Sequence, residues 1–294
     1  MAQHDHYYVP AQSKWPIIAT VGLLVTMFGL GTWFNDLKAG HPGHGQWIFL
    51  AGMLIVVYMF FGWFGAVIKE SHAGLYSPQL DRSFRWGMGW FIFSEVMFFA
   101  AFFGTLFYVR VWAGPWLSGE GAKGVAHMLW PNFEFAWPLL HTPDPKLFPP
   151  PKGTIDPWHL PLINTLLLVS SSVTITIAHH ALRRGHRGAL KLWLAATIVL
   201  GACFLALQAY EYAEAYHELG LTLGSGIYGA TFFMLTGFHG AHVTMGTLIL
   251  LVMLLRIMRG HFNADKHFGF EAASWYWHFV DVVWVGLFIF VYVI

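Results

Sequence analysis

Charged residues are scarce in this chain. Asp, Glu, Lys and Arg make up 11% of its 294 residues, whereas soluble domains carry about 25%. Hydrophobic residues make up 56%. This balance excludes an ordinary soluble domain and indicates an integral membrane protein. The net charge of +1 by itself favours no class of partner, and we expect no nucleic-acid partner.

Cysteine is almost absent. Cys203 is the single one, and it falls inside an apolar stretch. The chain therefore has no internal disulfide and no site in which two thiolates hold a metal. A dinuclear copper centre in this chain is excluded on the same ground. We interpret Cys203 as a small packing residue.

Long apolar stretches dominate the sequence instead. Roughly 20 residues of helix cross a hydrocarbon core about 30 Å thick. We predict an all-α integral membrane protein with seven transmembrane helices at residues 15–35, 47–68, 86–112, 159–182, 188–213, 226–257 and 270–292. Residues 113–158 form the one long connection. Its many Pro, Trp and Phe residues predict an irregular outer loop that lies against the membrane interface or a partner.

Basic residues are divided unequally between the two sides of these spans. Eleven fall on one side: Lys14, Lys69, Arg82, Arg85, Arg183, Arg184, Arg187, Lys191, Arg256, Arg259 and Lys266. Five fall on the other: Lys38, Arg110, Lys123, Lys146 and Lys152. The positive-inside rule then predicts a cytoplasmic N-terminus and a periplasmic C-terminus. Residues 1–14 are polar, so we expect no signal peptide before the first span.

Five ionisable side chains fall near the middle of predicted spans: Glu95, His239, His242, His278 and Asp281. Such groups are costly in a membrane and need a partner or a function. Glu95 lies about 15 Å from the inner end of its helix. Its neighbours are aromatic, so desolvation should keep the carboxyl group protonated at neutral pH unless it is paired.

The spacing of the other four allows them to join Glu95. His239 and His242 are three residues apart, as are His278 and Asp281, so each pair shares a helical face. We predict that the five side chains can form one buried network. Its role is left open between mutual hydrogen bonding that holds the helices in register, proton or ligand traffic, and contacts with partner subunits.

The sequence also contains candidate residues for a metal site and for a lipid site. We expect no metal, although His278 and Asp281 could complete a site begun by His239 and His242. The adjacent His179 and His180 are interpreted as a solvated helix cap. Trp63, His72 and Arg256 lie near inner span ends and are candidates for binding a phospholipid headgroup, with ordinary interfacial packing as the alternative.

Several stretches resemble subunit III of the haem-copper oxidases, and specifically of the cytochrome c oxidases. They are Arg85–Glu95, Leu162–Thr165, Ile177–His180, Leu207–Tyr212, Gly226–Phe233, Thr236–Val243 and His267–Trp284. The last of these is highly specific, and the resemblance runs from Lys69 to the C-terminus. The first two spans match only through features such as Trp15, Pro16 and Trp63. The loop 113–158 is longer than in the mitochondrial pattern and resembles a bacterial elaboration.

The resemblance implies a fold and a role. The fold is residues 1–68, holding the first two helices, separated by a lipid-filled cleft from a five-helix bundle at 69–294. The role is that of a non-catalytic accessory subunit of a proton-pumping cytochrome c oxidase in an aerobic respiratory chain. Such a subunit binds subunit I beside subunit II and holds structural phospholipids. It supports proton uptake and protects the active site during turnover, and Glu95 matches the family's membrane-embedded carboxyl group.

The same resemblance places the haems and coppers in partner subunits, with cytochrome c reached through the complex. The expected location is the inner membrane of a bacterium. The third subunit of a quinol oxidase is an alternative within the family, although that type typically has five spans. A small-solute or proton transporter is an alternative from another class, but no internal repeat supports it. A retinal pump is excluded because no Lys follows Lys266 to form a Schiff base.

Overall fold

A computed structural model describes residues 8–9, 12–40, 43–264 and 266–294, and this part of the chain holds helices and loops without a strand. Seven of the helices are long and apolar enough to cross a membrane. The prediction of seven transmembrane helices in an all-α protein is therefore confirmed. The chain forms two compact units, Met1–Phe84 and Arg85–Ile294, and the boundary between them falls inside the third helix, α3 (Pro78–Tyr108). The expected division after residue 68 stays a prediction.

The first unit is built on a hairpin of α1 (Trp15–Ala39) and α2 (Gly45–His72). The two helices approach closely because small residues face the contact. A Cβ atom added to Gly29 would lie 2.2 Å from the backbone nitrogen of Phe49, and one added to Gly52 would lie 2.4 Å from that of Thr26. Beside the connection between the two helices, the Asp36 carboxylate accepts a hydrogen bond from the Gly45 amide at 3.0 Å. Small residues thus allow the close packing on which helix pairs in lipid depend.

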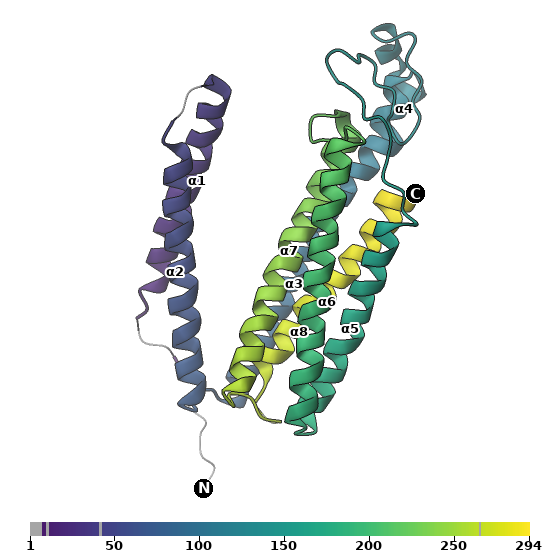
Figure 1. Ribbon diagram of the computed structural model, residues 1–294. Helices are drawn as coiled ribbons and strands as arrows, with labels where there is room; N and C mark the ends of the chain where they lie inside the picture. Colours follow the sequence, from purple (N-terminus) through teal and green to yellow (C-terminus); the bar gives the residue numbers. More distant parts are fainter. Residues whose placement is uncertain (1–7, 10–11, 41–42, 265) are drawn as a thin grey trace. The chain divides into compact units, whose positions relative to one another are not determined.

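The second unit contains most of α3 (Pro78–Tyr108) and four further long helices, which run alongside one another in Figure 1. These are α5 (Leu160–Arg183), α6 (Arg187–His217), α7 (Gly226–Met258) and α8 (Phe268–Leu287), which a π-helical turn extends over Phe288–Val293. The α5–α6 turn is tight, and Gly185 adopts φ of 76° there, a conformation that favours glycine.

Large aromatic side chains fill the interior where α5, α6, α7 and α8 meet. Trp277, Trp284, Phe204 and Phe232 are almost fully buried. Each indole N–H has a partner on α5: Trp277 donates to the Ser171 hydroxyl at 2.9 Å and Trp284 to that of Thr165 at 3.0 Å. The core therefore combines dense packing with satisfied donors, as a buried indole requires.

The long connection between α3 and α5 packs onto the bundle. It begins with a π-helical turn (Val109–Ala113) and α4 (Gly114–Leu117), and it includes a 3₁₀ helix (Gly121–Met128). The rest is irregular, as the sequence predicted. Phe133 and Leu139 are buried against the core, so the loop covers one end of the second unit.

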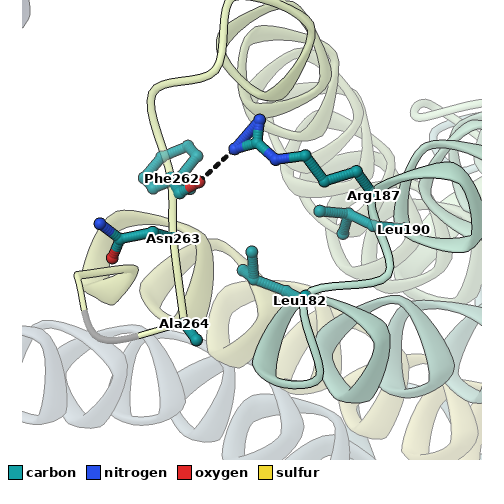
Figure 2. A pocket seen from close by; sticks show the side chains of 7 residues that line it. Leu182, Arg187, Leu190, Phe262, Asn263 and Ala264 are labelled. Carbon is teal, nitrogen blue, oxygen red and sulfur yellow. Dashed lines mark hydrogen bonds between the residues drawn. The ribbon is translucent and has the colours of Figure 1, made fainter.

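The other end of this unit is closed by the connections 184–186 and 259–267. The guanidinium group of Arg187 donates to the backbone oxygen of Phe262, across a hollow that is also lined by Leu182 and Leu190 (Figure 2). This contact ties the α5–α6 turn to the α7–α8 loop. The two basic connections therefore lie on one side of the bundle.

Candidate functional site

Glu95 on α3 and His242 on α7 form the central polar contact of the second unit. The Nε2 atom of His242 lies 2.9 Å from Oε2 of Glu95. The other ring nitrogen, Nδ1, lies 2.6 Å from the backbone oxygen of Phe238. Because α3 approaches its neighbours through long side chains, this pair is one of the contacts that join it to the bundle.

The hydrogen-bond pattern fixes how many protons the pair holds. The Phe238 oxygen can only accept, so Nδ1 of His242 carries a hydrogen. The contact between Nε2 and Oε2 then needs one further proton, held either by the carboxyl group or by the imidazole. A single proton is therefore shared between Glu95 and His242. Without this proton, Nε2 and Oε2 would be two acceptors facing each other, and the contact between α3 and α7 would lose its hydrogen bond.

Aromatic rings lie around the pair. The rings of Phe99 and Phe98 lie 5.0 and 5.8 Å from the His242 ring, between their centroids. The ring of Tyr276 stacks at 6.5 Å. The side chains of His242 and Glu95 are 16% and 22% exposed, so the pair is half-buried. The polar contact between α3 and α7 is thus held among apolar rings.

Of the other three residues of the expected network, the two histidines have partners outside it. His239 is fully buried, and its Nε2 lies 3.1 Å from the Val280 backbone oxygen. His278 Nδ1 lies 2.7 Å from the Ser172 hydroxyl. Oδ1 of Asp281 is buried without a hydrogen-bond partner among the described residues. Of the five, the structure brings only Glu95 and His242 into hydrogen-bonding contact.

The candidate lipid-binding residues lie near helix ends. Trp63 is 46% exposed and stacks on Phe64, with ring centroids 5.6 Å apart. His72 is the last residue of α2 and is exposed. Arg256 is half-buried, and its guanidinium group lies 4.3 Å from the Phe262 ring centroid. Their role in lipid binding stays a prediction.

His179 differs from the solvated cap that the sequence predicted. Its ring is half-buried and lies 5.6 Å from that of His267 and 5.8 Å from that of Phe270, between centroids. One ligand atom each from His179, His267 and Glu271 lies within 4.8 Å of the other two. The carboxyl group of Glu271 also accepts from Arg85 at 2.6 Å. The three side chains have the geometry to hold a metal ion, and the expectation of no metal stays a prediction.

Sequence reasoning missed two polar contacts. The ion pair between Arg85 and Glu271 joins α3 to α8. Glu211, on α6, is almost fully buried and accepts from Tyr292 and Gln208. Glu211 lies inside the predicted span 188–213, and a carboxyl residue within a span was the signal that could have identified it. The partner of Arg85 is 186 residues away, and no spacing rule could identify it.

Seven helices long and apolar enough to cross a membrane, together with the polar groups inside the second unit, define a multi-pass helical membrane protein. Residues 4–121 and 126–294 match the family model for cytochrome c oxidase subunit III. The chain is 39% identical to cytochrome c oxidase subunit 3 of Danio rerio over 294 residues, and this alignment covers 99% of the chain and 98% of the relative. The chain belongs to the cytochrome c oxidase subunit III family.

Two further relatives give the same result. The subunits 3 of Drosophila melanogaster and Dugong dugon are each 38% identical to the chain, over 297 and 296 residues, with 99% of the chain and 98% of each relative covered. Membership makes the chain a multi-pass membrane protein of an oxidase and implies a complex with other oxidase subunits. These relatives are animal proteins, and they do not support the bacterial source that the sequence suggested.

Proposed function

We propose that the chain is a non-catalytic accessory subunit of a proton-pumping cytochrome c oxidase. It binds subunit I directly and subunit II within the complex, supports proton uptake into subunit I and protects the active site during turnover. Haems and coppers lie in those partners, and cytochrome c delivers electrons through the complex. Family membership over nearly the whole chain is the observation that carries the proposal. The single proton shared by Glu95 and His242 supports a role near proton transfer.

Co-purification tests this function directly. A tagged chain, purified in mild detergent from cells that make the whole oxidase, is expected to bring larger haem-bearing subunits with it. The same chain expressed alone should show no haem absorbance and no stoichiometric copper. A tagged chain that emerges without partners, while oxygen reduction stays in the unbound fraction, would contradict the proposal. So would metal that is retained by the pure chain and lost on His239→Ala or His242→Ala.

Orientation is part of the proposal, with the N-terminus in the cytoplasm and the C-terminus in the periplasm of a bacterial cell. The second unit supports a common side for its basic connections, because Arg187 contacts the 259–267 loop. At the opposite end, Arg110 donates to the backbone oxygen of Ile294. A C-terminal tag should therefore be accessible in spheroplasts and protected in inside-out vesicles. The reverse pattern of accessibility would invert the assignment.

Phospholipid binding by Trp63, His72 and Arg256 is the third element of the proposal. The Trp63→Ala, Arg256→Ala double variant should retain fewer phospholipids in native mass spectrometry, because it loses interfacial packing and a headgroup charge. Trp47→Ala with Arg184→Ala is the matched control, since it removes one exposed Trp and one exposed Arg elsewhere. Equal lipid occupancy in the two double variants would remove the named residues from the proposal.

A further inference from the structure

Glu211 is a carboxyl group buried inside the second unit, apart from the Glu95–His242 pair. Glu211 on α6 is 1% exposed. The Tyr292 hydroxyl donates to its Oε1 at 2.6 Å, and Nε2 of Gln208 donates to the same oxygen at 3.2 Å. Both hydrogen bonds therefore end on the same oxygen of the Glu211 carboxyl group, Oε1.

Two buried acceptors beside this contact lack a donor. Oε2 of Glu211 and Oε1 of Gln208 have no hydrogen-bond partner among the residues that the structure describes. A carboxylate offers only acceptors, as does the amide oxygen, so neither can satisfy the other while Glu211 is ionised. A buried polar atom without a partner costs about 1–3 kcal/mol, and more when it is charged.

No positive charge compensates for an ionised Glu211 in the described structure. Among the described residues, Arg85 is paired with Glu271 and His242 contacts Glu95. The titratable side chains that act on Glu211 are three tyrosines and an exposed carboxylate: Tyr212, Tyr228, Tyr292 and Glu214. A carboxylate at this position would be desolvated and unpaired.

We propose that Glu211 is a proton-binding site, held as a neutral carboxylic acid inside the bundle. The added proton turns Oε2 into a donor, and the unpartnered Oε1 of Gln208 supplies an acceptor. The carboxylic acid and the amide then share two hydrogen bonds. Nε2 of Gln208 donates to Oε1 of Glu211, and Oε2 of Glu211 donates to Oε1 of Gln208. Tyr292 donates to the remaining carbonyl oxygen, which links the protonated acid to the C-terminal turn Phe288–Val293.

Infrared spectroscopy of the assembled oxidase distinguishes a carboxylic acid from a carboxylate. The difference between the wild-type and Glu211→Gln spectra should contain the carbonyl band of a protonated acid. Tyr292→Phe should move this band to higher wavenumber without removing it, because the carbonyl oxygen loses one hydrogen bond. Glu214→Gln is the matched control, one helical turn away and exposed, and it should leave the band unchanged.

The same spectra can overturn the proposal. A wild-type minus Glu211→Gln difference that contains only carboxylate stretching bands would show that Glu211 is ionised. An acid band that Tyr292→Phe leaves at its original position would show that the protonated group is not the one bonded to Tyr292. Neither outcome would affect the proposed role of the chain as an oxidase subunit, which rests on co-purification.

Discussion

Glu95→Gln is expected to abolish modification of the chain by an apolar carbodiimide. Such reagents enter the membrane and react with protonated carboxyl groups. The proton shared with His242 resides on Glu95 when the pair is neutral. Glu95 should therefore be labelled ahead of the exposed Glu120 and Glu214. Mass spectrometry of peptides from the labelled oxidase measures the site directly.

Further variants separate the carboxyl group from its partner. Gln keeps the size and hydrogen bonding of Glu95, so assembly with subunit I should survive in the Glu95→Gln variant. That variant should retain substantial oxygen reduction, with any defect in proton uptake or in lifetime during turnover. His242→Leu should leave Glu95 labelled, because the carboxyl group stays desolvated.

Two results would contradict this account of Glu95. One is labelling spread over Glu120 and Glu214 with Glu95 untouched. The other is a fully assembled Glu95→Gln oxidase that reduces no oxygen, which would make Glu95 catalytic.

Composition and the lengths of the apolar stretches were enough to predict the spanning helices. Each expected span lies within a long helix of the structure or overlaps most of one, because a run of apolar residues in lipid must satisfy its backbone internally. Helix ends were less predictable. The third span continues past residue 112 to Leu117 through a π-helical turn, since polar and interfacial residues extend helices beyond the hydrocarbon core.

The partners of polar side chains were the least predictable feature. Spacing alone placed His239 and His242 on one face of α7. It could not show that His242 would contact Glu95 and that His239 would contact the Val280 backbone. These contacts depend on how far each helix is rotated and shifted against its neighbour. Packing of large side chains between helices sets that rotation. A single sequence does not show which side chains of different helices pack together, so it does not reveal the rotation.

Trp277→Ala is expected to lower the free energy of unfolding by about 3–5 kcal/mol, the usual cost of truncating a fully buried Trp or Phe. The indole ring lies against two glycines: a Cβ atom added to Gly201 would lie 2.6 Å from the ring, and one added to Gly246 would lie 3.0 Å from it. Its N–H also bonds to Ser171. The side chain on α8 thus fills space between α5, α6 and α7. Unfolding of the chain by SDS in mixed micelles, followed by circular dichroism, measures the loss.

Two variants separate packing from hydrogen bonding. Trp86 is 72% exposed on α3, and Trp86→Ala should change the free energy of unfolding by less than about 0.5 kcal/mol. Trp277→Phe keeps most of the ring and loses the hydrogen bond, so its cost should approach the ~1 kcal/mol of one such bond plus a small cavity. Lipid tails are as apolar as the core, so close packing and hydrogen bonds, rather than removal from water, must hold these helices together. A loss for Trp277→Ala no greater than that for Trp86→Ala would show that the interior around Trp277 contributes little to stability.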